Sequence, residues 1–225
     1  MTQQAEGRPV GEKSVFDVLT WEDVKEHYLE RRKIHDRLRK LHADKKAIPF
    51  ARLLVGISDI HGNYSARDHN LGPKILDQNP RAPQRLYDLA ERFLTLENVH
   101  DVPQTIRNAG LKYFQIGVGS EASCLLNPQV CWIANTRSIW THLVFKHKGD
   151  TGRANEELKL YRNGEETSEM AYRMWSGIHR EMGDHLVDII QEARKFADMA
   201  SVKPGKLKYI WADAIANALY AYHHD

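Results

Sequence analysis

The feature that most constrains the fold is a long helical repeat that begins at Ser168. Apolar side chains recur there every three or four residues: Ala171, Trp175, Ile178, Met182, Leu186, Ile189, Ala193 and Phe196. This spacing predicts one amphipathic helix that ends near Met199 and is about 48 Å long at 1.5 Å per residue. Gly183 keeps the phase of the repeat but is a position where the helix can kink. We expect this helix to lie centrally, with the ring of Trp175 in the core.

Six further segments have the spacing or the caps of helices. They are residues 21–45, 84–96, 102–109, 127–148, 155–162 and 207–222. Thr20 is a suitable N-cap for the first of them, and Asn127 followed by Pro128 is typical of a helix start. Two short apolar segments, residues 50–59 and 111–118, are candidates for strands. Residues 61–83 are rich in Asn, Asp, Gly and Pro and predict a long loop.

Two candidate strands among so many helices do not make a wound sheet, so the predicted fold class is mainly α. We expect a helical bundle-like single domain with one long central helix and at most two short strands. A chain of 225 residues suits one domain, here residues 15–225. The polar residues 1–14 before it predict a flexible N-terminal arm.

Composition excludes some classes of protein. No apolar run approaches the ~18 residues that a membrane span needs, so no membrane partner is expected. A net charge of +2 is too balanced to indicate a nucleic-acid partner by itself. Two cysteines, Cys124 and Cys131, are too few for a disulfide scaffold. They predict free thiols in a reducing compartment, and hence a cytoplasmic protein.

Residues 59–63 form a possible metal motif. Asp59-Ile-His61-Gly62-Asn63 resembles the first metal motif of calcineurin-like metallophosphoesterases, in which a strand delivers a carboxylate and an imidazole to one metal ion. The later G-N-H and G-H-x-H motifs of that family are absent from this sequence. A loop in which Asp59 caps its own turn is the alternative interpretation.

A second motif combines arginine and histidine. Arg137-Ser-Ile-Trp-Thr-His142 resembles the R-x4-H motif of HEPN ribonucleases, which are also all-helical, and Ser138 is polar as that motif requires. The resemblance implies that His142 acts as general acid or base and that Arg137 stabilises the phosphorane. Residues five apart lie about 140° apart around a helix axis, so both reach one phosphate only beside a cleft or a symmetry mate. A helix with both side chains on a solvated or interface face is the alternative.

Other histidines suggest metal chemistry. His-Asp pairs occur at His35-Asp36, His100-Asp101 and His224-Asp225. With His69 upstream and Asp184 or Asp188 downstream, the His100 pair resembles the ligand set of HD-type phosphohydrolases, whose site is a divalent metal. On the long helix, His179, Glu181, Asp184, His185 and Asp188 cluster within ten residues. Pairs four apart share a helix face, which suits either a helix-bundle metal site or a hydrated surface.

Two segments of the sequence have patterns that suit the binding of an anion. The backbone amides of Gly117-Val-Gly119 follow a candidate strand and can cradle an anion. The basic face of the first helix, which runs from Arg31 to Lys46, suits either phosphate binding or simple solvation.

Three of these patterns involve phosphate esters, and they predict a His/Arg-based hydrolase of nucleotides or RNA. The predicted catalytic residues are Arg137 and His142, with His179 and His185 as second candidates. Two alternatives stay open at this stage. One is a non-catalytic helical interaction protein that forms a homo-oligomer, for which the long helix and its methionines predict a homodimer. The other is a helical His/carboxylate metalloenzyme. The sequence does not decide whether the protein is an enzyme, and it assigns no cofactor or metal.

Overall fold

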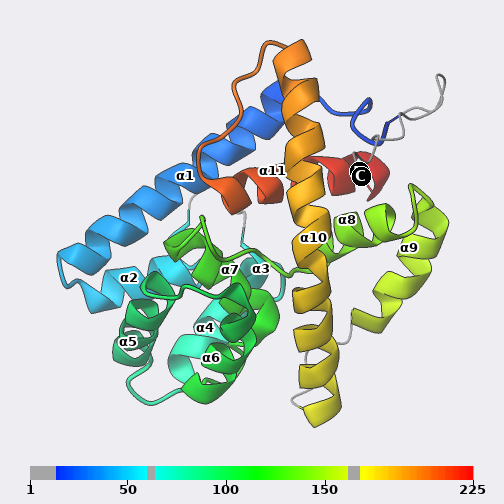
Figure 1. Cartoon of the computed structure of the whole chain (residues 1–225). Coiled ribbons are helices and arrows are strands. Elements are labelled where there is room, and N and C mark those ends of the chain that lie inside the picture. The colour runs from blue at the N-terminus through cyan, green and yellow to red at the C-terminus, as the bar shows by residue number, and fades with distance from the viewer. Residues whose placement is uncertain (1–13, 60–63, 162–167, 225) are drawn as a thin grey trace, which may run out of the picture.

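The computed structural model describes residues 14–59, 64–161 and 168–224, which form one helical domain without a strand in those ranges (Figure 1). The first five helices are α1 (Trp21–Ala43), α2 (Ala47–Leu54), α3 (Ser65–Asp68), α4 (Leu71–Asp77) and α5 (Ala82–Leu94). Next come α6 (Val102–Ala109), α7 (Ile116–Leu126), α8 (Thr136–Lys146) and α9 (Thr151–Leu158). The last two are α10 (Glu169–Met199) and α11 (Lys208–His224). Short 3-10 turns, Val99–Asp101 and Lys159–Tyr161, precede α6 and follow α9.

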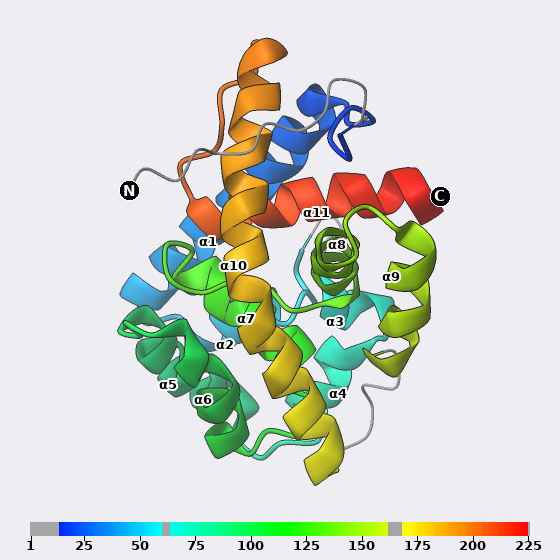
Figure 2. The same ribbon diagram turned by 45° about the vertical axis from the view of Figure 1, so that its right-hand side comes forward.

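The long helix is confirmed as the uninterrupted α10, which spans the molecule in Figures 1 and 2. It begins at Ser168, whose hydroxyl accepts a hydrogen bond from the N–H of Ala171. Its buried stripe runs from Ile178 to Ala197 and packs on α7, α8 and α11. Residues before Ile178 are half-buried or exposed, because α10 extends beyond the core there.

Gly183 does not break α10; it brings the helix close to Trp132. A Cβ at this position would lie 2.9 Å from Cη2 of the buried Trp132 ring. The indole Nε1 of Trp132 donates to the backbone carbonyl of His179, one turn earlier on α10. The glycine therefore serves helix packing rather than a kink.

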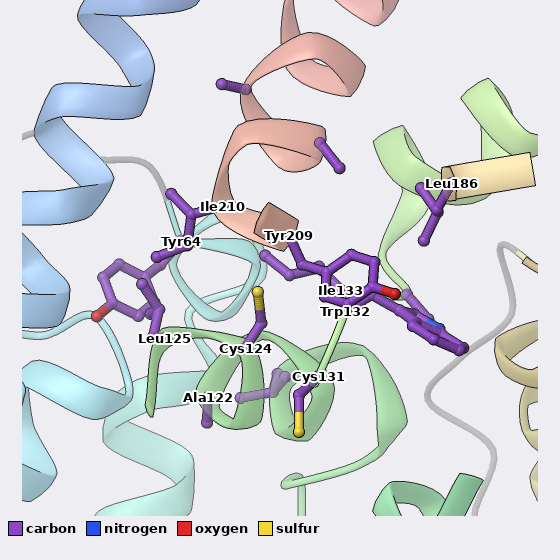
Figure 3. Packing of buried hydrophobic residues seen from close by; sticks show 14 of the residues in the cluster. Tyr64, Ala122, Cys124, Leu125, Cys131, Trp132, Ile133, Leu186, Tyr209 and Ile210 are labelled. Carbon is purple, nitrogen blue, oxygen red and sulfur yellow. The ribbon is translucent and has the colours of Figure 1, made fainter. Parts of the chain in front are cut away.

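The second central element is α7, which contacts α1, α3, α5, α6, α10 and α11. Nearly all of its side chains are buried, and many are small, so neighbouring helices approach it closely. Figure 3 shows this part of the core, where Cys124 and Leu125 of α7 face Tyr209 and Ile210 of α11. Cys124 and Cys131 are both buried free thiols, and their sulfurs point away from each other (Figure 3).

Both strand candidates are wrong. Most of residues 50–59 belongs to α2 and the turns after it, and residues 111–118 contain the turn that leads into α7. A short apolar run is ambiguous because a wholly buried helix and a buried strand have the same composition. The expected helix start at Asn127 is also wrong. Asn127 ends α7, and its side-chain amide donates to the carbonyls of Phe93 and Leu96.

Two further expectations change. Of the proposed long loop, residues 61–63 lie outside the described part of the chain, and most of the remainder forms α3 and α4. The ring of Trp175 is only partly buried.

The predicted N-terminal arm lies outside the described residues except for Ser14, whose N–H donates to the carboxylate of Asp17. In the described part of the chain, no helix is long and apolar enough to cross a membrane.

Candidate functional site

A cleft of about 450 Å³ opens beside the N-terminal half of α10. Its walls come from the first turns of α7 and α8, from α3 and the start of α4, and from single residues of α10 and α11. In Figure 2, α10 crosses in front of α7, and α8 and α9 lie to its right. The lining side chains with polar groups or rings are Ser65, His69, Tyr113, Gln115, Asn135, Thr136, Arg137, Tyr161, Trp175 and Tyr220.

Basic side chains and the starts of two helices face this cleft. Arg137 and His69 are the basic side chains among its lining residues, and no aspartate or glutamate occurs among the described residues that line it. The first turns of α7 and α8 also face the cleft, where helix dipoles carry partial positive charge. Gln115, the N-cap of α7, makes no side-chain cap hydrogen bond. The cleft is therefore suited to an anion.

Local sequence fixes the start of α8. Asn135 is its N-cap, and its side-chain oxygen accepts from the N–H groups of Arg137 and Ser138. The Ser138 hydroxyl in turn accepts from the Asn135 N–H, which completes a capping box. The amide of Asn135 donates to the hydroxyl of Ser65 at 3.2 Å. The cap thus positions Arg137 in the first turn of α8, and the Asn135 side chain joins the start of α8 to α3.

Arg137 is held by α11. Its Nη1 donates to Oδ1 of Asn217 at 2.7 Å. The amide nitrogen of Asn217 donates to the backbone carbonyl of Asp213 at 2.8 Å and to its carboxylate at 3.2 Å. Asp213 is buried, so the orientation of the guanidinium depends on a hydrogen-bond chain that reaches into the core.

Asp213 belongs to a buried ion network with Arg31 of α1 and Glu121 of α7. Arg31 is 1% exposed; its Nη2 lies 2.7 Å from Oε1 of Glu121 and its Nε 3.3 Å from Oδ2 of Asp213. Burial acts to lower the pKa of Arg31, but the two carboxylates outweigh it and raise that pKa, so the guanidinium stays charged. Burial raises the pKa of Glu121. Burial also acts to raise the pKa of Asp213, but the charge of Arg31, followed by the hydrogen bond from His27, outweighs burial and lowers that pKa.

This ion network also supports the other side of the cleft. The second carboxylate oxygen of Glu121 accepts from the N–H of Ser65 at 2.9 Å. The guanidinium of Arg31 lies over the ring of buried Tyr64, 5.1 Å from its centroid. Three residues of the cleft, Ser65, Asn135 and Arg137, are therefore joined by hydrogen bonds to each other or to the buried ions.

The remaining wall is aromatic. Trp175 is half-buried and meets Tyr161 edge-on, with ring centroids 6.4 Å apart. Gly117 faces the indole, since a Cβ there would lie 3.8 Å from its Cζ3. Gly117 and Trp175 both line the cleft, so the indole borders this space beside a residue without a side chain.

The structure separates Arg137 from His142. His142 is buried between α8 and α10 and does not line the cleft. Its Nδ1 lies 2.9 Å from Nδ1 of His185, so these two predicted residues are in contact. Burial, followed by the charge of His185, lowers the pKa of His142 to about 3. His179 is also buried, stacked on Trp132 at 5.4 Å, and burial lowers its pKa to about 3.

The proposed metal motifs do not assemble in the described residues. Within residues 14–59, 64–161 and 168–224, no three His, Cys, Asp or Glu side chains are grouped to hold a metal ion. His61, Gly62 and Asn63 lie outside those ranges, and Asp59 is buried, with its carbonyl accepting from Arg67. His69, proposed as part of an HD-type set, instead lines the cleft.

Sequence reasoning missed the ion network, although a signal for it existed. Arg31 was assigned to the basic face of the first helix, but it lies on the apolar stripe between Tyr28 and Ile34. Glu121 and Asp213 are likewise single charges within apolar segments. A lone charge on a buried stripe predicts a buried partner, because an unpaired ion in a core is strongly unfavourable.

No family model matches this chain, and neither curated proteins nor solved structures include a significant match to it.

Proposed function

We propose that the cleft binds a phosphate ester of the nucleotide class, either a free nucleotide or RNA. The observation that carries this proposal is Arg137, which Asn217 holds in a cleft that has an aromatic wall. Guanidinium matches the paired oxygens of a phosphate, and an aromatic ring offers a stacking surface to a base. A volume of about 450 Å³ lies within the usual range for small-ligand sites.

Each part of the cleft has a role in this proposal. Arg137 and the first turns of α7 and α8 receive the phosphate, as the sequence suggested for the amides around Gly117. Trp175 stacks against the base. Hydrogen-bonding groups of Gln115, Asn135 and Ser65 line the same space and are available to polar edges of the ligand.

The binding experiment is a calorimetric titration with a nucleoside monophosphate, with inorganic phosphate as a second probe. We expect Arg137→Gln to weaken nucleotide binding about 10- to 100-fold, because a charged hydrogen-bond donor is lost. Arg153→Gln is the matched control, since Arg153 is an exposed arginine of α9 outside the cleft. Unchanged affinity in Arg137→Gln, with an unchanged melting temperature, contradicts the proposal.

Hydrolysis of the bound ester is a second proposal, favoured by the presence of His69 in the same cleft as Arg137. His69 is exposed, and imidazole is the side chain most often used for general acid–base catalysis. The sequence-based proposal gives that role to His142, with His179 and His185 as second candidates. A cleavage assay across RNA, cyclic nucleotides and nucleoside phosphates separates the two assignments of the catalytic histidine. Loss of activity in His69→Gln supports the histidine of the cleft. Loss of activity only in His142→Gln, with an intact fold, supports the histidine of the R-x4-H motif.

The interaction-protein alternative retains one observation in its favour. Leu160, Met170 and Met174 are apolar yet 60%, 73% and 36% exposed. We therefore keep a homodimer as a proposal, and light scattering that shows a monomer at high micromolar concentration refutes it. A cytoplasmic location likewise remains a proposal, supported by the two unpaired buried thiols.

A further inference from the structure

A separate cavity of about 350 Å³ lies between α6, the turn before α7 and the first two turns of α10. The buried stripe of α10 begins only at Ile178, so the first turns of this helix lie outside the closely packed core and leave space beside α6. The volume falls within the usual range for small-ligand sites. The buried side chains that line this cavity are all apolar: Pro103, Ile106, Leu111, Phe114 and Ile116.

Three aromatic rings line the cavity. Phe114 is buried, whereas Tyr172 and Trp175 of α10 are half-buried. The hydroxyl of Tyr172 donates to Oε1 of Gln104 at 3.2 Å, which connects α10 to α6. Aromatic rings pack well against other rings in offset-stacked or edge-to-face arrangements. The shape and lining of the cavity therefore suit a planar, apolar group.

The charged side chains of the lining are paired with each other. Nη1 and Nη2 of Arg107 donate to the two carboxylate oxygens of Glu169 at 3.3 and 2.6 Å. The Arg107 guanidinium also lies 4.3 Å from the centroid of the Tyr172 ring. The Glu169 carboxylate accepts a further hydrogen bond from Nε of Arg173 at 3.1 Å. Because Arg107 and Glu169 each have a partner of opposite charge, a charged ligand would have to compete with that partner.

We propose that this cavity binds an uncharged small molecule built on a planar apolar ring, with a hydrogen-bonding group directed to Gln115. Gln115 lines the cavity, and as the N-cap of α7 it makes no side-chain cap hydrogen bond. The inference does not rest on the proposed function, because it uses neither Arg137 nor a phosphate. Gln115 and Trp175 also line the cleft, so the variants that test the inference change residues that line this cavity alone.

The first test compares two probes that share one ring system and differ in charge. Calorimetric titration of the full chain uses 2-naphthol, which is neutral at pH 7, and 2-naphthoate, which is anionic. We expect 2-naphthol to bind with 1:1 stoichiometry and about tenfold more tightly, because 2-naphthoate loses hydration without gaining an unpaired cation. Absence of 2-naphthol binding, or 2-naphthoate binding at least as tightly, overturns the proposal.

Substitutions on neighbouring residues of α10 locate the bound probe. Ala171 lines the cavity, so Ala171→Trp fills it, whereas Met170 is 73% exposed and lies outside it. Ala171→Trp should weaken 2-naphthol binding at least about tenfold, and Met170→Trp should leave it unchanged. Ala171→Leu is the smaller second variant, with an expected loss of about threefold, and melting temperatures verify that each variant folds. Full affinity in a folded Ala171 variant places the probe elsewhere and overturns the proposal.

A last pair of variants tests whether the ion pair sets the preference for uncharged ligands. Glu169→Gln removes the carboxylate partner of Arg107. We expect it to raise the 2-naphthoate affinity about three- to tenfold and to leave the 2-naphthol affinity unchanged. Glu156→Gln is the matched control, because Glu156 is an exposed, paired glutamate of α9 outside the cavity. An unchanged 2-naphthoate affinity in Glu169→Gln contradicts this account of selectivity. A 2-naphthol affinity that falls as the protein concentration rises would show that a second copy covers the cavity, and would also overturn the proposal.

Discussion

At the scale of single residues, the buried arginine of α1 lies between two buried carboxylates. Arg31→Met removes the cation between Glu121 and Asp213 and leaves two carboxylates buried together. We expect it to lower the free energy of unfolding by about 3–5 kcal/mol. Urea denaturation provides the measurement. Arg32→Met is the matched control, because Arg32 is exposed on the same helix. Its ion pair with exposed Asp36, at 4.0 Å, contributes little to stability. Equal stability of the two variants contradicts the ion network.

Buried histidines make stability depend on pH. Burial lowers the pKa of His142 and of His179 from 6.5 to about 3. An unfolded histidine takes up its proton near pH 6.5, whereas these two stay neutral in the folded protein until about pH 3. The unfolded state therefore binds more protons between these values, and the free energy of unfolding falls as the pH falls. Each histidine accounts for a loss of about 2 kcal/mol between pH 7 and pH 5.

Denaturation curves at pH 7 and pH 5 check this dependence. His179→Phe keeps a ring against Trp132 but cannot titrate, so it should lose less stability on acidification than the wild type. His69→Gln serves as the control, because His69 is exposed. A pH dependence that is the same in wild type and His179→Phe would show that this imidazole does not resist protonation.

At the scale of elements, α10 offers a matched pair of glycines. A Cβ at Gly183 would lie 2.9 Å from the ring of Trp132, whereas a Cβ at Gly177 has no neighbour within 4 Å. We expect Gly183→Ala to destabilise the protein by about 1–3 kcal/mol through overpacking. Gly177→Ala should stabilise it by up to about 1 kcal/mol, because alanine favours a helix more than glycine does. Thermal denaturation of both variants is the measurement, and stabilisation by Gly183→Ala contradicts the close packing.

The elements that the sequence predicts well are those with one buried and one exposed face. The expected bounds of α1, α6 and α10 agree with the structure within two residues, because each exposes one face and buries the other. The prediction fails at α7, which is buried on nearly all sides and so has no polar face to set a period. The prediction also fails at Asn127, because an asparagine is suited both to the start and to the end of a helix. Its hydrogen bonds to the carbonyls of Phe93 and Leu96 place it at the end of α7.

At the scale of the whole molecule, the sequence predicts the fold class but not the cleft. The mainly α single domain follows from patterns within single helices. The cleft combines residues far apart in the chain, such as Ser65, Arg137 and Tyr220, which only tertiary packing brings together. The motif predicts a role for Arg137, but nothing in the sequence points to Asn217, because its hydrogen bond to Arg137 depends on the contact between α8 and α11.

The central claim is that Arg137 and Trp175 contact the same phosphate-bearing ligand. The most direct measurement is a crystal structure of the full chain grown with a nucleoside monophosphate. The account predicts the phosphate within hydrogen-bond distance of the Arg137 guanidinium and the base against the indole of Trp175. A nucleotide bound elsewhere on the protein, with this cleft holding only solvent, would contradict it.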